Sequence, residues 1–314
     1  MAPNVVLVTG AGSYLGGQLA ARLAADPSIE RVLGVDLSPP AKTPKGRVEF
    51  VAADIRSPRI GKVIDSAKVD TVVHAAPRPS VGPRRAAIKE LNVIGTMQLL
   101  AACQRSKSLR KLVVKSTADV YGAGPAAPAV FTEQDGPTGG TAAEIEGYVS
   151  GFARRRPDVA LTTVRLAEMI GPGVDNALAR YFALPVVPTL LGFDARVQLL
   201  HHQDAIAVLD RAATHDLPGV FNVGGDGVIM LSQAIRRAGR VPLPMPRAAI
   251  GPATRLVRGT ELSPELARFL NYGRVIDTTR LKTAFGFTPR WTTADAFDDY
   301  VHGRGAVSME ASRA

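Results

Sequence analysis

The chain has 314 residues, of which 46% are hydrophobic, and a formal net charge of +10 at pH 7. This length and composition suit one large or two modest domains with a sizeable core, and they exclude collagen-like, coiled-coil and disordered proteins. The lysines and arginines are scattered in small groups without interleaved aromatic residues or a nucleic-acid motif, so nucleic acid is not an expected partner.

Neither a signal peptide nor a membrane span is predicted. Met1 to Asn4 lead straight into the first apolar run, and the best apolar stretch, Tyr181 to Phe193, is short and broken by two prolines. The single cysteine, Cys103, has no partner for an internal disulfide and falls on the apolar face of a helical pattern. These features predict a cytoplasmic protein with a packed thiol and no membrane partner.

The first feature of the chain is a strand, a glycine-rich turn and a helix. Val5 to Val8 form a buried-strand pattern, and apolar residues return at helical spacing from Leu15 onward. The segment between them, TGAGSYLGG at 9–17, would let backbone N–H groups gather around a phosphate at a helix N-terminus. The sequence therefore predicts a dinucleotide cradle at this turn.

A second short strand, Arg31 to Asp36, ends in a carboxylate about twenty residues after the turn. A carboxylate there accepts hydrogen bonds from an adenosine ribose and repels a 2′-phosphate, which favours NAD over NADP. The alternative is that Asp36 only caps a loop, and Lys42 and Arg47 lie near enough in sequence to soften the preference for NAD.

Strands and helices then alternate. Strands are predicted at 48–55, 70–76 and 111–117, with a long helix at 86–107 before the last of them. Such alternation requires a parallel sheet with helices on both faces, which is the doubly wound α/β architecture. Ligands of these sheets lie at the carboxyl ends of the strands, where Asp36, Asp54, 74–76 and 116–117 fall.

The second half of the chain alternates less regularly. Its predicted segments are a loop at 125–140, a helix at 142–156, a strand at 160–165, short strands at 197–200 and 220–223, a helix at 202–213, a Pro-rich stretch at 241–252 and a helix near 293–302. We expect a dinucleotide-binding domain at 1–165 to which 197–225 returns, a smaller C-terminal lobe mostly at 166–302, and a flexible tail at 303–314.

In these motifs the chain resembles the extended short-chain dehydrogenase/reductase family, and within it the NAD-dependent epimerases and dehydratases of nucleotide sugars. The resemblance runs from Thr9 to about Val301. It is carried by TGAGSYLG (9–16), Asp36, ADI (53–55), HAA (74–76), NVIGT (92–96), STADVYG (116–122), RLAEMIGP (165–172), HHQD (201–204) and FNVG (221–224). It implies a Rossmann fold, NAD as cofactor, a small-molecule substrate, and a homodimer formed through the helices at 86–107 and 142–156.

The resemblance also implies which residues form the site. Thr117 takes the place of the catalytic hydroxyl. Tyr121 is a further catalytic candidate, but a structural role in supporting its loop is favoured for it. Residues implied to bind the cofactor are Gly10, Gly12, Ser13, Tyr14, Leu15, Gly16, Asp36, Asp54, Ile55, Ala75, Ala76, Asn92 and Ser116. Residues implied to lie near the substrate are Pro77, Glu168, Arg196 and His201, and no metal site is expected.

Three departures from the family pattern stand out. Ser13 replaces the middle glycine of the turn, so its Cβ is expected to crowd the pyrophosphate. The family's Tyr-x-x-x-Lys pair aligns with Thr138 and Ala142, and the sequence has no lysine between Lys115 and Lys282. Glu168 stands where the family usually has an asparagine, and a carboxylate there would repel a diphosphate.

A tyrosine without a nearby cation keeps a pKa near 10 and is a poor base at neutral pH. Tyr121, Tyr148, Asp119 and Glu144 are the possible substitutes, although Glu144 and Glu146 also fit a solvated helix face. Three functions therefore stay open: an atypical NAD-dependent epimerase or dehydratase, a non-catalytic NAD-binding sensor or scaffold, and an enzyme on this scaffold that uses another base.

Overall fold

A computed structural model describes residues 3–39, 47–77, 85–246, 248–249 and 263–311. The chain divides into two compact units. The first unit comprises residues 1–117, 139–165 and 205–221, and the second comprises residues 118–138, 166–204 and 222–314.

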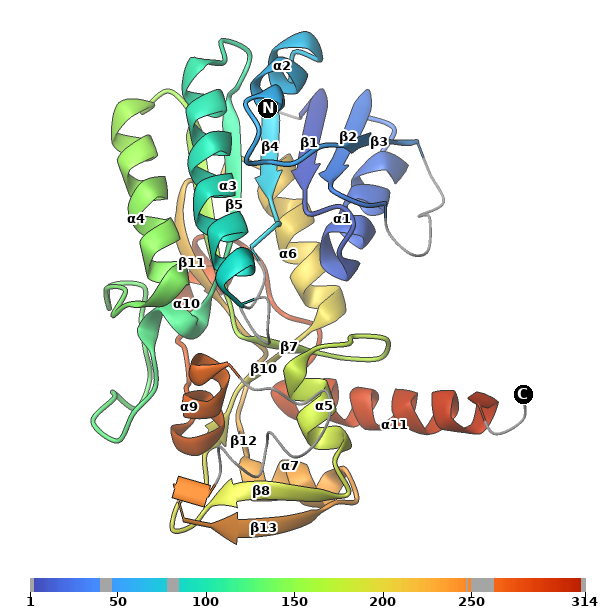
Figure 1. Ribbon diagram of the computed structural model, residues 1–314, viewed down its shortest axis with the longest axis vertical. Helices are drawn as coiled ribbons and strands as arrows, with labels where there is room; N and C mark the ends of the chain where they lie inside the picture. The colour runs from blue at the N-terminus through green and yellow to red at the C-terminus, as the bar shows by residue number, and fades with distance from the viewer. Residues whose placement is uncertain (1–2, 40–46, 78–84, 247, 250–262, 312–314) are drawn as a thin grey trace. The chain divides into compact units, whose positions relative to one another are not determined.

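A seven-stranded parallel sheet in the order β11-β6-β5-β4-β1-β2-β3 forms the centre of the first unit (Figure 1). The predicted doubly wound sheet is thereby confirmed. The elements that build this unit are β1 (Val5–Thr9), α1 (Tyr14–Ala25), β2 (Arg31–Asp36), β3 (Val48–Ala52), α2 (Arg59–Ser66), β4 (Thr71–His74), α3 (Arg85–Arg105), β5 (Lys111–Thr117), α4 (Gly140–Arg155), β6 (Ala160–Leu166), α6 (His202–Thr214) and β11 (Gly219–Val223).

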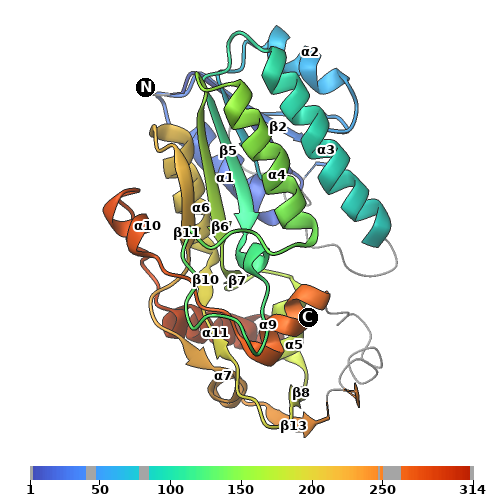
Figure 2. The ribbon, with the colours of Figure 1, turned by 90° about the vertical axis from the view of Figure 1, so that its left-hand side faces the viewer.

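Helices cover both faces of this sheet. Figure 2 shows α3 and α4 on one face and α6 on the other, and the Arg22–Asp210 ion pair, at 2.9 Å, joins α1 to α6. Because strand side chains alternate between faces, Val5 and Leu7 of β1 pack into the core beneath α2, α3 and α4, and Val6 and Val8 point the other way. All four residues, three valines and one leucine, are buried, which explains the unbroken apolar run of β1.

The strand order places β1 between β2 and β4. Val8 of β1 lies beside Gly34 on one side and Val73 on the other, in parallel register. In chain order, β2 and β3 are added on one side of β1, and β4 and β5 are then added on its other side. This reversal lies between β1 and β4, and doubly wound sheets bind their ligands at the carboxyl ends of the strands at such a point.

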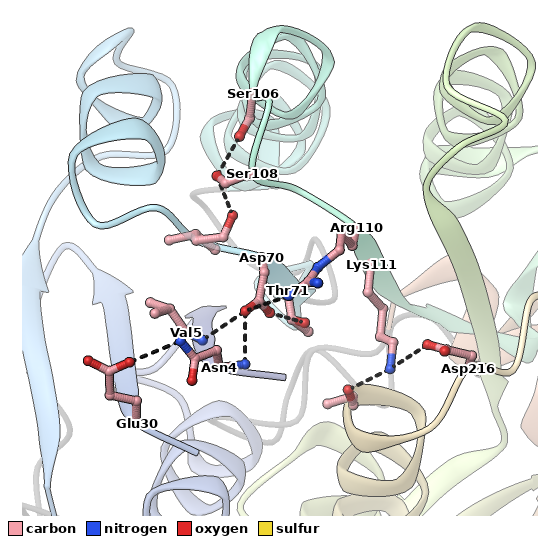
Figure 3. A network of polar contacts seen from close by, with 12 residues as sticks. Asn4, Val5, Glu30, Asp70, Thr71, Ser106, Ser108, Arg110, Lys111 and Asp216 are labelled. Carbon is pink, nitrogen blue, oxygen red and sulfur yellow. Dashed lines mark hydrogen bonds and ion pairs between the residues drawn. The ribbon is translucent and has the colours of Figure 1, made fainter. Parts of the chain in front are cut away.

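A polar network secures the opposite, amino-terminal edge of the sheet (Figure 3). The carboxylate of Asp70 accepts hydrogen bonds from the backbone N–H groups of Asn4 and Val5, at 2.8 and 3.1 Å, and from the Thr71 hydroxyl at 2.7 Å. Nearby, the buried Lys111 ammonium donates to the Ala213 carbonyl and pairs with Asp216, both at 3.0 Å. These bonds satisfy polar groups at the starts of β1, β4 and β5 and tie α6 to the sheet.

The second unit has its own core, built on helices and short strands. Its elements are the 3₁₀ helix η1 (Ala118–Tyr121), β7 (Glu168–Ile170), α5 (Ala177–Ala183), β8 (Val186–Leu190), β9 (Arg196–Val197), β10 (Leu199–His201), β12 (Ile229–Met230), α7 (Leu231–Arg237), β13 (Val241–Met245), α9 (Pro264–Tyr272), α10 (Thr279–Thr283) and α11 (Thr293–Ala311). The aromatic rings of Phe182 and Phe297 meet edge to face, with centroids 4.9 Å apart, at the centre of its core.

The structure differs from the sequence prediction in several elements. The strand predicted at 48–55 ends at Ala52, and the strand predicted at 197–200 is two strands that pair with different partners, β12 and β7. The Pro-rich stretch contains β13, which forms a two-stranded sheet with β8. Prolines are tolerated there because each strand of a two-stranded sheet has an unpaired edge. The last helix, predicted near 293–302, continues to Ala311.

Across the part of the chain that the structure describes, no helix has the length and apolar character needed to cross a membrane. Cys103 is buried in the first core, and burial raises the pKa of its thiol to about 12.

Candidate functional site

The glycines of the first turn are required by close backbone packing. Gly10 has a φ of +77°, and a Cβ there would lie 2.7 Å from the Cα of Ala76. A Cβ on Gly16 would collide with the carbonyl oxygen of Gly10, and one on Gly12 would collide with the carbonyl oxygen of Ser38. The turn between β1 and α1 is therefore closed too tightly for side chains at these three positions, which leaves its backbone open to a ligand.

Ser13 has a local role that sequence reasoning missed. It is the N-cap of α1: its hydroxyl accepts a hydrogen bond from the Gly16 N–H at 3.2 Å and donates one to the Gly10 carbonyl at 2.7 Å. Serine is among the preferred N-cap residues, so its place just before a helical pattern was the available signal. The serine fixes the geometry of the turn that the glycines make possible.

Asp36 is tied to the same turn. Its carboxylate accepts the Gly12 N–H at 3.0 Å and the Leu37 N–H at 2.7 Å. The Gly10 N–H in turn donates to the Val35 carbonyl at 2.9 Å. The end of β2 and the first turn thus form one hydrogen-bonded structure, with a carboxylate at its rim.

The next strand end carries Asp54 and Ile55. Asp54 pairs with Arg56 at 2.7 Å, and these hydrogen bonds lower the pKa of its carboxyl group. Ile55 is buried against α3 at Gly95, where a Cβ would come 2.5 Å from its Cδ1. The glycine of the NVIGT segment is therefore needed to seat Ile55. Asn92, one turn earlier on α3, is buried as well.

His74, which precedes Ala75 and Ala76, is the centre of a buried hydrogen-bond network. Its Nδ1 lies 2.7 Å from the Thr9 hydroxyl and its Nε2 lies 2.8 Å from the Thr96 hydroxyl. Because the Thr96 hydroxyl donates its own proton to the Asn92 carbonyl, at 2.6 Å, Nε2 must be the protonated ring nitrogen. Burial and the charge of Lys115 lower the pKa of His74 to about 3, so the ring is neutral.

This neutral histidine makes stability depend on pH. The unfolded chain takes up a proton near pH 6.5 and the folded chain only near pH 3, so the unfolded state binds more protons between these values and stability falls as the pH falls. We expect a loss of about 2 kcal/mol between pH 8 and pH 5 from this residue. Urea-induced unfolding at several pH values should show that the free energy of unfolding depends less on pH in His74→Gln than in the wild type. An equal pH dependence in the two proteins would contradict a neutral His74.

Thr117 closes β5, and its neighbour Ser116 points to the opposite face of the strand. The Ser116 hydroxyl donates to Glu146 of α4 at 2.5 Å, and Glu146 pairs with Arg165 of β6 at 2.7 Å, with both side chains at most 7% exposed. The expectation that Glu146 lies on a solvated helix face is wrong, because Arg165 neutralises it inside the unit. Glu144 is partly exposed, as expected.

In the second unit, Tyr121 is held by neighbours on both sides. Its hydroxyl donates to Asn222 at 2.7 Å, and its ring stacks on Phe131 with centroids 4.9 Å apart. The Asn222 N–H donates to Glu133 at 2.9 Å. This packing supports the structural alternative for Tyr121, and a catalytic role stays a prediction. Thr138, aligned with the missing tyrosine, donates its hydroxyl proton to the Val120 carbonyl at 3.1 Å.

The second unit also brings together three charged residues that are far apart in sequence. The Arg274 guanidinium, 3% exposed, lies 2.6 Å from an oxygen of Asp119 and 3.4 Å from an oxygen of Glu168. Burial and the adjacent Asp119 carboxylate raise the pKa of Glu168 to about 8, although Arg274 opposes the shift. At neutral pH the carboxyl group of Glu168 is therefore mostly protonated. Sequence analysis singled out Asp119 and Glu168 separately and missed Arg274.

The other substrate candidates of this unit differ in exposure. Arg196 is exposed and donates to the Ala129 carbonyl at 2.8 Å. His201 is buried, stacks on Trp291 at 4.2 Å and lies 3.0 Å from the Asp299 carboxylate. Asp204 accepts the backbone N–H groups of Arg290 and Trp291. The HHQD segment thus holds the segment around Trp291 in place, and a substrate role for His201 stays a prediction.

Comparison with known proteins identifies the family. The sequence matches the NAD-dependent epimerase/dehydratase family over residues 6–224. The chain belongs to this family. An uncharacterized protein of Mycobacterium tuberculosis (strain ATCC 25618 / H37Rv) is 53% identical over 325 aligned positions, which cover 98% of this chain and 86% of that protein. The human short-chain dehydrogenase/reductase family 42E member 1 is 35% identical over 119 residues, 37% of this chain and 30% of that protein.

Solved structures of similar fold include UDP-glucose 4-epimerase of Thermotoga maritima with UDP-glucose, with a TM-score of 0.75 and 19% identity over 97% of this chain and 99% of that one. Another is dTDP-glucose 4,6-dehydratase of Bacillus anthracis in complex with NAD, with a TM-score of 0.72 and 17% identity over 96% of this chain and 97% of that one.

The cofactor of this epimerase/dehydratase family member is NAD. The residues of the first unit fit it: the turn excludes side chains at Gly10, Gly12 and Gly16, and Asp36 offers a carboxylate at its rim. A ribose between Asp36 and the turn and a pyrophosphate at the start of α1 would use both features. Among the described residues, no group of histidine, cysteine and acidic side chains could hold a metal ion.

Proposed function

We propose that this family member is an oxidoreductase that transfers hydride between NAD and a nucleotide sugar or a related hydroxylated small molecule, with an atypical acid–base group. The observation that carries the proposal is the position of Thr117. It ends β5, a strand of the same sheet in which β1 and β2 carry the glycine turn and Asp36 at their carboxyl ends. Structures of similar fold that hold UDP-glucose or NAD support the proposal.

NAD, when bound, supplies a nicotinamide ring that takes up and returns a hydride. The Thr117 hydroxyl would hydrogen-bond the reacting substrate oxygen and hold the carbon that bears it in place. The proton of a substrate hydroxyl needs a separate acceptor, because this chain has no lysine between Lys115 and Lys282 to activate a tyrosine.

Candidates for this acceptor within the first unit are Tyr148 and Glu144 of α4. We also propose that the protein is a homodimer through α3 and α4, helices that pack against each other in each chain.

The test is to incubate the protein with NAD and a panel of nucleotide sugars, and to measure NADH absorbance and epimerised or dehydrated product. We expect Thr117→Val to lower kcat at least 100-fold and to leave NAD binding unchanged.

A panel in which no nucleotide sugar reacts would still distinguish between the possible functions. If NAD raises the melting temperature but no substrate reacts and Thr117→Val changes nothing, the protein is the non-catalytic NAD-binding sensor or scaffold. If turnover occurs and Thr117→Val leaves kcat unchanged, the hydride transfer stands and another group holds the substrate oxygen.

A further inference from the structure

The Lys115 side chain lies at the carboxyl end of β5, on the same face as Thr117. Val114 packs in the core beneath α3 and α4, and Ser116 bonds Glu146 on α4. Since alternate residues of a strand point to opposite faces, Lys115 and Thr117 share the other face.

The Lys115 ammonium reaches toward the glycine turn. Its Nζ donates to the Pro77 carbonyl at 2.5 Å. Pro77 follows Ala76, which is the residue that packs on Gly10 of the turn. The positive charge of Lys115 also helps to lower the pKa of His74. The ammonium is therefore held near the carboxyl ends of β4 and β5.

The strand order determines which half of a bound NAD lies near the Lys115 ammonium. Asp36 at the end of β2 binds the adenosine ribose in the proposed cofactor site, and the pyrophosphate lies at the turn after β1. A dinucleotide that spans the crevice must then extend its other half over β4 and β5, because these strands follow β1 on the side away from β2.

We infer that Lys115 places a fixed positive charge beside the nicotinamide and makes the protein bind NADH more tightly than NAD⁺. The oxidised ring carries a positive charge and the reduced ring carries none, so only the oxidised form is repelled. At a half-buried site, two unit charges several ångströms apart shift such an equilibrium about tenfold. The inference rests on the proposed NAD site of the first unit and needs no knowledge of the substrate.

This preference favours one direction of hydride transfer. In that direction a substrate carbinol carbon gives its hydride to the nicotinamide, its hydroxyl proton goes to a base, and a carbonyl remains. Lys115 itself gives up no proton; it acts by its charge.

The test measures dissociation constants of NAD⁺ and NADH by calorimetry, without substrate. We expect the ratio of the NAD⁺ to the NADH constant to fall about tenfold in Lys115→Met and to be retained in Lys115→Arg. Lys107→Met is the matched control, because Lys107 is an exposed lysine that precedes the amino end of β5. Lys115→Gln provides a second neutral variant if Lys115→Met does not fold.

An unchanged ratio in a folded neutral variant that binds both nucleotides would overturn the inference and leave the NAD site intact. An equal fall in Lys107→Met would overturn it as well, because the effect would then come from net charge. Failure of the wild-type protein to bind either nucleotide would overturn the cofactor site together with the inference.

Discussion

Asp36→Ala is expected to weaken NAD binding about 10- to 100-fold. The carboxylate lies at the rim of the glycine turn, 3.0 Å from the Gly12 N–H, where it can accept hydrogen bonds from both ribose hydroxyls. Loss of two charge-assisted hydrogen bonds accounts for the size of the effect. Removal of the negative charge also removes repulsion of a 2′-phosphate, so the preference for NAD over NADP should fall. Calorimetric titration with both nucleotides measures both changes.

Two further variants separate this role from simpler explanations. Asp36→Asn retains an oxygen that can accept a hydrogen bond from the Gly12 N–H and loses the charge, so it should keep the turn and still bind NADP better. Glu49→Gln removes an exposed carboxylate from the neighbouring strand β3 and should leave both affinities unchanged. NAD affinity that is equal in Asp36→Ala and the wild type would show that Asp36 only caps its loop.

Glu146→Gln and Arg165→Met are each expected to lower the free energy of unfolding by about 3–5 kcal/mol. The two side chains are 7% and 5% exposed and pair at 2.7 Å inside the first unit. Removal of one partner leaves a buried charge or a buried donor without compensation, and this costs far more than loss of a surface pair. Urea-induced unfolding followed by circular dichroism measures the change.

The double variant Glu146→Gln/Arg165→Met should be more stable than the sum of the single losses predicts, because it leaves no buried charge unpaired. The exposed Arg31–Glu49 pair is the matched comparison, at the same distance of 2.7 Å, and its removal should cost less than about 1 kcal/mol. A loss of that small size from Glu146→Gln would contradict the account given for the buried pair.

Local patterns in the sequence predicted most of the first unit. The strand at 31–36 and the strand at 111–117 have the predicted bounds, and the predicted helix at 86–107 differs from α3 by one residue at its start and two at its end. These elements are recognisable because each has an apolar pattern of one period, bounded by glycine, proline or polar residues. The second unit was harder to predict, since its strands are two to five residues long and pair with distant segments.

The sequence by itself determined the parallel sheet, the glycine turn with Asp36, and the absence of any lysine between Lys115 and Lys282. Each depends on residue type and local spacing. Only the tertiary structure decided that Glu146 is buried beside Arg165, that Asp119 and Glu168 share Arg274, and that Lys115 reaches Pro77. These contacts join residues 19 to 155 positions apart, and burial and charge at such distances follow from how strands and helices pack, which no local pattern records.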